Sequence, residues 1–222
     1  YALVNMDPRW YCTYDPAYGK RIYPLVREIA TFWERDVIWD EMQERYIIDK
    51  DSVHEGSGQD LNACLSLGLV RNALDLALDM SQALNRDAER RDQWRHILKH
   101  LSHYSFQEKG GKTVFRYTEK GTAWWQNNTL GIQQIYPAGQ IHLDSDPELL
   151  EVSRNTIEVM QRWLDGNGSN SFFPAAVRIG YDPVTILEQL RNYAKHSYPH
   201  GFQAGNPPGI ENLSTVPNTI NE

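Results

Sequence analysis

Residues 59–80 read Q-D-L-N-A-C-L-S-L-G-L-V-R-N-A-L-D-L-A-L-D-M, and this stretch decides the fold class. Its apolar side chains recur three and four residues apart, which is the period of one face of an α-helix. Asp60 or Gln59 stands where such a helix would open. We expect an amphipathic helix with an inward face that carries Leu61, Cys64, Leu65, Gly68, Leu69, Leu76 and Met80.

The same period predicts five further helices. Pro24 fits the first turn of one of them, and Asp146-Pro147-Glu148 and Asp182-Pro183 each combine a capping residue with a proline at the first helical position. The expected spans are about 22–45, about 87–101, 147 to near Gly166, 183 to about His196, and a last helix that begins near Pro217.

One segment follows the period of a strand instead. Gly110-Gly111 precedes an alternating run over residues 113–117, which predicts a short hairpin within residues 104–127. The fold class is therefore all-α, with antiparallel helical hairpins and a small β-hairpin insertion. We expect residues 1–222 to form a single domain that is a fragment of a longer chain.

Composition excludes several classes of function. The net charge is −7 and the sequence pI is near 5.5, so no basic face is expected for a nucleic acid. No apolar stretch approaches the ~18–20 residues that would span a bilayer. Cys12 and Cys64 are too few for a disulfide framework. The 7 Trp, 12 Tyr and 6 Phe are a composition that suits sugar subsites.

Two acidic residues stand in loops just ahead of helix-like runs. Glu55 lies in V-H-E-G-S-G-Q-D at 53–60, and Glu211 lies in N-P-P-G-I-E-N-L-S at 206–214. Two carboxylates are the minimum equipment for acid/base hydrolysis of a glycosidic bond, because one donates a proton while the other accepts one. An isolated Glu near a Gly is more often a solvated loop residue, so this pattern alone is weak.

Other residues are candidates for substrate binding. Trp124 and Trp125 offer aromatic faces to pyranose rings, or else pack against neighbouring helices. Asn128 offers hydrogen bonds to sugar hydroxyls, or else belongs to a polar turn. Arg178 is a substrate contact or an ordinary ion-paired residue. The remaining candidates flank the two acids: His54 and Asp60 near Glu55, and Asn212 beside Glu211.

A metal site is not expected. His96, His100 and His103 follow helical spacing, but no acid or Cys is placed to complete a ligand set. These histidines also end a helix, where a cationic side chain suits the helix dipole. We expect no cofactor.

Several short blocks resemble the catalytic domain of glycoside hydrolase family 95, whose members are inverting α-L-fucosidases and α-L-galactosidases. The resemblance covers roughly residues 15–222. The blocks that carry it are His54-Glu55-Gly56 ahead of Gln59-Asp60, Tyr136–Ile141, Asp146–Leu149, Gly209–Asn212 and Pro217–Glu222. The resemblance implies a six-hairpin α/α toroid, here partial, with Glu55 as general acid and Glu211 as general base.

The chain departs from the family pattern at several places. Only Glu55 remains of the Ser-Pro-Glu segment of the acid, and Glu211 stands where the family has an Asp base. Residues 126–129 hold no His where the family has a His-rich segment. The paired Asn residues that orient the family's water would lie upstream of Tyr1.

The resemblance implies an oligosaccharide or glycan substrate, flanking domains of the same chain as partners, and a secreted or periplasmic location. Two other functions stay open. One is a non-catalytic helical module that binds sugar or only packs against its neighbours. The other is an inverting phosphorylase, which needs one essential carboxylate and a basic phosphate pocket.

Overall fold

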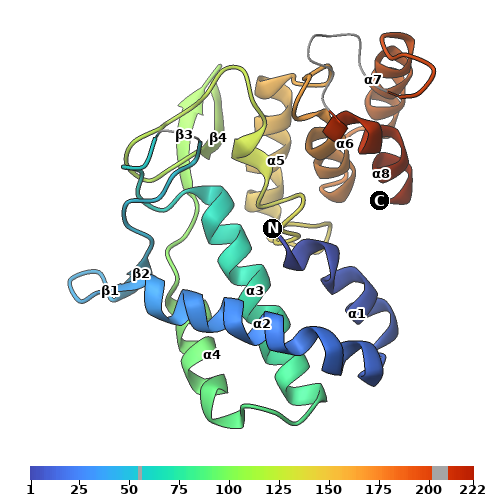
Figure 1. Ribbon diagram of the computed structural model, residues 1–222. Coiled ribbons are helices and arrows are strands. Elements are labelled where there is room, and N and C mark those ends of the chain that lie inside the picture. The colour runs from blue at the N-terminus through green and yellow to red at the C-terminus, as the bar shows by residue number, and fades with distance from the viewer. Residues whose placement is uncertain (55–56, 202–209) are drawn as a thin grey trace. The chain divides into compact units, whose positions relative to one another are not determined.

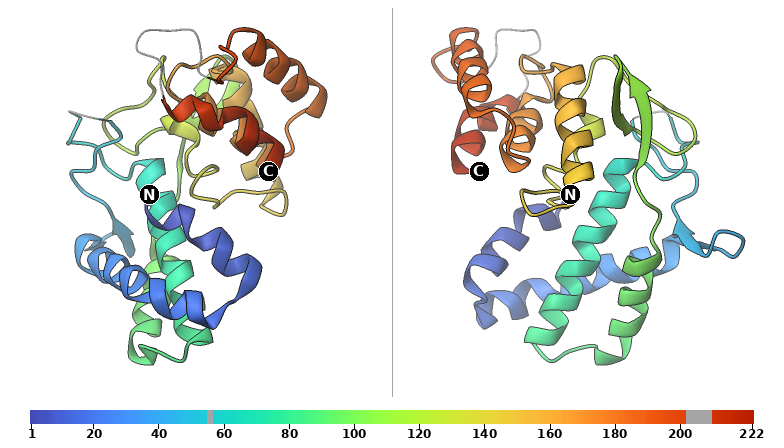
Figure 2. Two further views of the ribbon diagram at one scale, coloured as in Figure 1. Left: turned by 45° about the vertical axis from the view of Figure 1, so that its right-hand side comes forward. Right: turned by 180° about the vertical axis from the view of Figure 1, so that it is seen from behind.

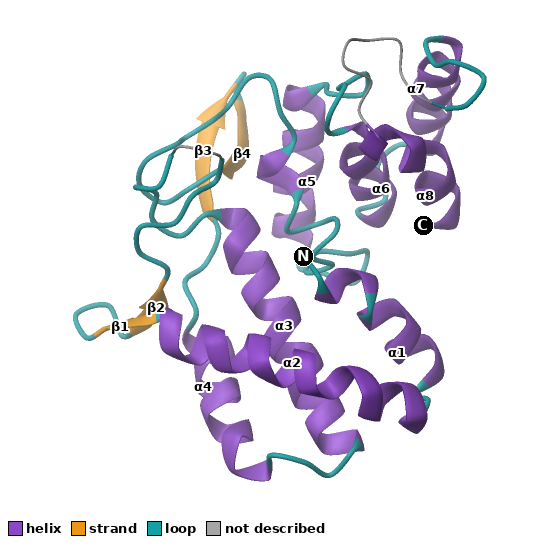
Figure 3. Ribbon diagram, in the orientation of Figure 1, coloured by secondary structure: helices purple, strands orange, loops and turns teal. Residues whose placement is uncertain are grey.

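The computed structural model describes residues 1–54, 57–201 and 210–222. It is mostly helical, at 55%, and it has two small antiparallel hairpins (Figure 3). The expectation of an all-α fold with a small β insertion is therefore confirmed, although two hairpins are present where one was predicted.

The described residues divide into two compact units. Unit 1 comprises Tyr1–Tyr104 with Thr118–Gly121, and unit 2 comprises Ser105–Tyr117 with Thr122–Glu222. Whether the two units behave as the single domain that the sequence suggested stays a prediction, and so does the partial toroid. No described helix is long and apolar enough to cross a membrane.

Unit 1 is built around three helices that contact one another, α2, α3 and α4 (Figure 1). Trp10, Tyr23, Val26, Leu74 and Trp94 belong to its core, and each is at most 1% exposed. The elements in chain order are η1 (Leu3–Asn5), α1 (Asp7–Thr13), α2 (Pro16–Asp36), β1 (Ile38–Asp40), β2 (Arg45–Ile47), α3 (Cys64–Ala83), η2 (Ala88–Arg90) and α4 (Arg91–His100).

The helix predicted at 59–80 exists as α3, but it begins at Cys64 and is buried on more than one face. Leu67, Val70 and Leu74 are as buried as the predicted inward residues, whereas Leu61 and Leu69 are only half-buried. A helix that is apolar over most of its circumference is the centre of a unit rather than its surface, and α3 keeps only the narrow polar stripe of Arg71, Asp75 and Asp79.

The helix predicted over 22–45 is wrong at its C-terminal end. It is α2, which ends at Asp36, and Pro24 lies in its interior rather than in its first turn. A hairpin follows, in which Ile38, Trp39 and Asp40 pair with Ile47, Tyr46 and Arg45. The Asp40 carboxylate accepts hydrogen bonds from the backbone N–H groups of Met42 and Gln43, which stabilises the turn instead of a continued helix.

Unit 2 contains one hairpin and four α-helices in its described part. In Figure 1, and in the rear view of Figure 2, the hairpin lies on one side of α5, whereas α6, α7 and α8 lie on the other side. The elements are β3 (Ser105–Lys109), β4 (Lys112–Arg116), η3 (Leu130–Ile132), α5 (Pro147–Met160), α6 (Ser169–Arg178), α7 (Pro183–Lys195), η4 (Ile210–Ser214) and α8 (Thr215–Asn221).

The predicted hairpin within 104–127 is confirmed as β3 and β4. Its turn is Gly110-Gly111, both with positive φ, at 61° and 74°. Two consecutive positive φ angles are typical of the turns that match the twist of paired strands, and glycine adopts them without steric cost. β4 packs on α5, where the Thr156 hydroxyl accepts a hydrogen bond from the Phe115 N–H at 3.0 Å.

The two Asp-Pro helix starts are also confirmed. Asp146 caps α5 by accepting from the Glu148 N–H, and Asp182 caps α7 by accepting from the Thr185 N–H. α5 ends at Met160, earlier than predicted, and Gln161 takes a left-handed conformation as its cap. α6 and α1 were not predicted. The last helix is present as α8 and begins at Thr215.

Candidate active site

The candidate site is centred on η4 in unit 2, where the backbone around Glu211 is held by its neighbour Asn212. Asn212 is 1% exposed. Its Oδ1 accepts a hydrogen bond from the Ser169 hydroxyl at 2.8 Å, and its Nδ2 donates to the Gly166 carbonyl. The Tyr193 hydroxyl donates to the Asn212 carbonyl at 3.1 Å. Three bonds from α6, α7 and the loop before α6 therefore hold this one residue.

Glu211 is exposed, in contrast to the residue after it. Within the described part of the chain its carboxylate makes no ion pair, and the Ser214 hydroxyl donates to its backbone carbonyl at 2.8 Å. A carboxylate on a fixed backbone with access to water has the position that general-base chemistry needs. The predicted base thus lies on an anchored turn.

The loop with Trp124, Trp125 and Asn128 packs next to the start of α6. A Cβ on Gly168 would lie 2.2 Å from the Thr129 hydroxyl oxygen, so the two backbones approach as closely as glycine permits. Gly168 directly precedes Ser169, which binds Asn212. The loop of predicted sugar contacts and the turn that carries Glu211 therefore border the same short segment.

The Asn128 side chain has two polar groups, of which only one is hydrogen-bonded to a described residue. Its Oδ1 accepts from the Leu130 N–H at 3.0 Å, whereas its Nδ2 is buried without a partner among the described residues. The Asn170 Oδ1, in the first turn of α6, is likewise buried without one in the described chain. Buried polar atoms are nearly always paired, so an unused donor and an unused acceptor beside this segment are consistent with a site that binds a polar ligand.

The Trp124 ring is partly committed to packing. It lies 5.3 Å from the Tyr117 ring, and the Lys109 ammonium lies 5.1 Å from its centroid. Both Trp124 and Trp125 are half-buried, and the Tyr117 hydroxyl is 3.3 Å from the Trp125 carbonyl. The predicted platform is positioned by Tyr117, and its role in sugar binding stays a prediction.

Arg178 ties α6 to α8 and to the preceding loop. It donates to both carboxylate oxygens of Glu222, with the Nη2–Oε1 distance at 2.9 Å, and to the Ile135 carbonyl at 3.3 Å. Its guanidinium lies 4.7 Å from the centroid of the Tyr136 ring. Burial, followed by the charge of Glu222, raises the pKa of Tyr136. These contacts give Arg178 a structural role, and a substrate role stays a prediction.

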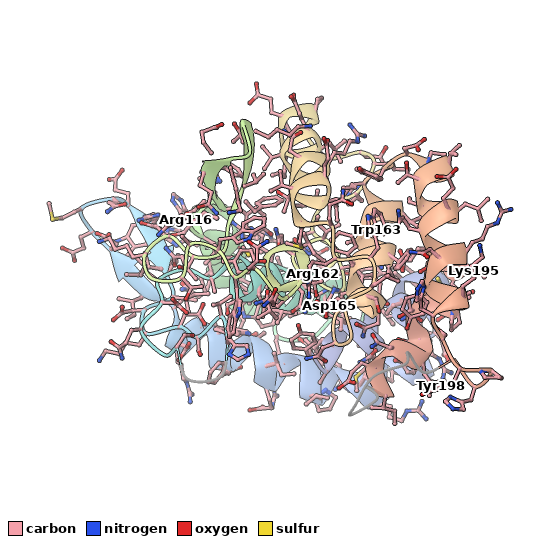
Figure 4. The ribbon with its side chains drawn as sticks, turned by 90° about the horizontal axis from the view of Figure 1, so that it is seen from above. Arg116, Arg162, Trp163, Asp165, Lys195 and Tyr198 are labelled. Atoms are coloured by element: carbon pink, nitrogen blue, oxygen red, sulfur yellow. The ribbon has the colours of Figure 1, made fainter. Side chains whose placement is uncertain are left out.

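The loop before α6 contains a buried carboxylate that the sequence reasoning missed. Asp165 is 5% exposed and pairs with Arg162, whose Nη2 lies 2.6 Å from its Oδ2 (Figure 4). Its Oδ1 accepts from the Asn167 N–H at 2.8 Å. Figure 4 also labels Lys195, the last residue of α7, and Tyr198, which lies beyond the end of that helix. The Asp165–Arg162 pair stabilises the turn that presents Gly166 to Asn212.

The two candidates that flank the predicted acid, His54 and Asp60, belong to unit 1. Glu55 lies outside the described residues. Asp60 is 3% exposed, and its Oδ2 accepts from the Val53 N–H at 3.1 Å. A Cβ on Gly121 would lie 2.2 Å from the Asp60 Oδ1, so this carboxylate is enclosed by backbone. His54 is half-buried, and its carbonyl accepts from the Ser57 hydroxyl at 2.9 Å.

Two of the histidines considered for a metal, His96 and His100, belong to an aromatic cluster with Trp39 in unit 1. The His96 and His100 rings stack with centroids 4.6 Å apart, and Trp39 lies 5.4 Å from His96. The described residues contain no group of three or more His, Cys, Asp or Glu that could hold a metal ion.

Ser169, Asn170 and Tyr193 are the site residues that the sequence analysis did not single out. Ser169 and Tyr193 bind Asn212 from 43 and 19 residues away. Their only sequence signal was weak: Ser169 follows Gly166-Asn167-Gly168, a break typical of a helix start.

A comparison with known families gives a match over most of the chain. The family described as the glycosyl hydrolase family 95 catalytic domain matches residues 4–179. A comparison with curated proteins finds no match. The matched range includes Glu55, Trp124, Trp125, Asn128 and Arg178, and it ends before Glu211 and Asn212.

Proposed function

The chain belongs to the catalytic-domain family of glycosyl hydrolase family 95, which supports glycoside hydrolase activity, and we propose that it hydrolyses α-L-fucosides or related glycosides with inversion. In this proposal Glu55 is the general acid and Glu211 is the general base. The substrate contacts are His54, Asp60, Trp124, Trp125, Asn128, Arg178 and Asn212. The sugar specificity rests on the family resemblance alone.

One observation in the structure supports the base. Glu211 is exposed on a turn whose next residue is held by three hydrogen bonds. General-base catalysis needs a carboxylate that is accessible to water and yet fixed in position, because a small displacement of the reacting groups lowers the rate steeply. The contacts of Asn212 supply the fixed position.

The chemistry requires two simultaneous proton transfers. A water oxygen attacks the anomeric carbon while Glu211 takes a proton from that water. The glycosidic C–O bond breaks, and Glu55 gives its proton to the departing oxygen. Because the water enters opposite the leaving group, the anomeric configuration inverts, and the two carboxyl groups are expected about 6.5–9.5 Å apart.

Glu211 carries one more methylene than the Asp that the resemblance leads one to expect. The longer side chain displaces the carboxylate relative to that of an Asp on the same backbone. We therefore expect Glu211→Asp to lower kcat without abolishing it, because the residual base still reaches the water at a less favourable distance.

The test is hydrolysis of aryl α-L-fucoside and aryl α-L-galactoside by the full-length protein. Glu211→Gln and Glu55→Gln are each expected to lower kcat by about 10²–10⁴-fold. Glu188→Gln is the matched control, since Glu188 is an exposed acid of α7 in the same unit. Wild-type activity in both test variants would refute the assignment of acid and base.

Product stereochemistry is the second readout. Inversion gives the anomer opposite to that of the substrate, and NMR identifies it before mutarotation. Retention would exclude the proposed mechanism, because it requires a covalent glycosyl intermediate. Sugar binding without any turnover would favour the non-catalytic module instead.

The resemblance also supports a secreted or periplasmic location and flanking domains within the same chain. Fractionation of cells that express the full-length protein tests the first proposal. Recovery in the cytoplasmic fraction alone would contradict it.

A further inference from the structure

A pocket of about 720 Å³ lies between the β3–β4 hairpin and the N-terminal half of α5, within unit 2. This volume is in the range of small-molecule sites. The pocket is lined by Phe106, Glu108, Gly111, Lys112, Thr113, Asp146, Glu148, Leu149, Glu151, Val152 and Asn155. None of these residues belongs to the proposed acid, base or substrate contacts.

Its apolar part combines an exposed aromatic ring with two aliphatic side chains. Phe106 is 46% exposed, whereas Leu149 and Val152 are half-buried. The Phe106 ring lies 5.7 Å from the fully buried Phe115 ring, which supports it from the core side. An aromatic ring in a hollow offers a face on which the C–H groups of a pyranose can stack.

Its polar part contains both acceptors and donors. The carboxylates of Glu148 and Glu151 are exposed and make no hydrogen bond with other described side chains, whereas Thr113 donates to Glu108. Asn155 donates to the Thr113 carbonyl at 3.3 Å and retains its amide oxygen. Sugar hydroxyls donate and accept, so they match such a mixture better than a ligand that only donates.

The net charge of the pocket lining restricts the class of sugar that can bind. Four lining acids, Glu108, Asp146, Glu148 and Glu151, face one lysine, so the lining carries a net charge of −3 at neutral pH. That lysine, Lys112, also pairs with Glu158 outside the pocket. A uronic, sialylated or sulfated sugar would meet like charge there, whereas a neutral sugar would not.

The pocket and the turn that carries Glu211 lie on different sides of α5. The hairpin is on one side of this helix, and α6, α7 and α8 are on the other, as Figures 1 and 2 agree. A ligand in the pocket therefore does not occupy the space next to Glu211.

We propose that this pocket is a second, non-catalytic carbohydrate site that binds a neutral sugar unit of a glycan. Phe106 stacks on the ring, and Glu148, Glu151 and Asn155 bind its hydroxyls. The inference uses the family membership for the ligand class, but it does not depend on the roles of Glu55 and Glu211. Such a site holds a glycan chain on the protein and raises its effective concentration at the active site.

NMR titration of the full-length protein tests the site, with fucosyllactose, galacto-oligosaccharides and xylo-oligosaccharides as neutral probes. We expect at least one probe to bind with a Kd of about 1–10 mM and to shift resonances of Phe106 and Val152. Phe106→Ala should weaken that binding at least tenfold. Phe32→Ala is the matched control, because Phe32 is 55% exposed on α2 in unit 1.

A second variant guards against a folding defect in Phe106→Ala. Glu151→Arg changes an exposed rim residue and reduces the negative charge. Sialyllactose should not bind the wild-type pocket and should gain affinity in this variant. Putrescine serves as a cationic probe.

Three outcomes would overturn the proposal: no neutral probe binds, binding survives Phe106→Ala unchanged, or putrescine shifts Phe106 and Val152 while the neutral probes do not. Aryl glycoside hydrolysis separates this inference from the proposed function. Full activity of Glu211→Gln with lost binding in Phe106→Ala refutes only the catalytic assignment. The reverse pattern refutes only the second site.

Discussion

The core of unit 1 and the turn around Asn212 in unit 2 are stabilised in different ways. In unit 1, α2, α3 and α4 bury apolar side chains such as Leu74, Met80 and Trp94 against one another. Around Asn212 the polar side chains of Ser169 and Thr215 are fully buried and bind each other at 3.2 Å. Apolar packing tolerates small shifts, whereas a buried polar group must find its partner. The buried polar contacts around Asn212 therefore fix the position of the turn that carries Glu211, as catalysis would require.

Leu74→Ala, in the core of unit 1, is expected to lower the unfolding free energy more than the other substitutions below. Leu74 is 0% exposed in α3, so its truncation removes buried area and leaves a cavity that costs about 3–5 kcal/mol in unfolding free energy. Urea denaturation measures it. Leu25→Ala is the control, since Leu25 is 42% exposed on α2 and should lose under about 1 kcal/mol. Equal losses in both variants would contradict the assigned core.

Asn212→Ala should separate stability from activity in unit 2. It removes the amide oxygen that accepts from the Ser169 hydroxyl, which keeps its contact with Thr215, and the amide group that donates to the Gly166 carbonyl, at a cost of about 1–3 kcal/mol. If the bonds of Asn212 position Glu211, kcat of the full-length enzyme should fall by at least tenfold at a temperature where the variant is folded. A stability loss with unchanged kcat would show that Asn212 is structural only.

Gly168→Ala sharpens the link between the two loops of the site. The added Cβ would clash with Thr129, and overpacking of this kind costs about 1–3 kcal/mol. Thr129→Ala in the same chain removes the hydroxyl that causes the clash and should restore part of the loss. Thermal denaturation of the two single variants and the double variant measures the coupling. Additive losses would mean that the two residues do not interact.

The smallest effect concerns Glu119 in unit 1. Hydrogen bonds from Arg45 to both of its carboxylate oxygens lower the pKa of Glu119 below its ordinary value of 4.5. A carboxylate with a lowered pKa in the folded state stabilises the fold above the ordinary value, and this stabilisation is lost as the pH falls through the folded pKa. Glu119→Gln should therefore cost about 1 kcal/mol at pH 7, and less as the pH falls below 4.5.

The measurement is the unfolding free energy of both proteins between pH 7 and pH 3. Glu108→Gln is a control in an exposed strand position of unit 2. A Glu119→Gln penalty that stays constant over this range would contradict the ion pair as its source.

Local sequence signals predicted the elements whose ends are stabilised by neighbouring residues in the chain. The Asp-Pro starts of α5 and α7 and the Gly-Gly turn of β3–β4 depend on residues within a few positions. The predicted start of α3 was too early, because the Asn62 side chain binds residues outside the helix. Its Oδ1 accepts from the Ile48 N–H and its Nδ2 donates to Glu119, 57 residues away. No local pattern shows such a demand.

α6 was missed for a related reason. It carries Pro174 in its interior, and proline there removes a backbone donor and usually ends a helix. The helix persists because Phe172, Phe173, Ala175 and Ala176 are all fully buried. Tertiary burial outweighed a local signal against helix formation.

The sequence by itself determined the helical class, the hairpin turn and the family to which the chain belongs, because periodicity, caps and short motifs are written in adjacent residues. It also named Glu211 and Asn212 as neighbours. Only the tertiary structure decided that Asn212 is buried while Glu211 is exposed, and that Ser169, Tyr193 and Gly166 hold this turn. The physical reason is that buried polar groups are paired by proximity in space, which positions along the chain do not reveal.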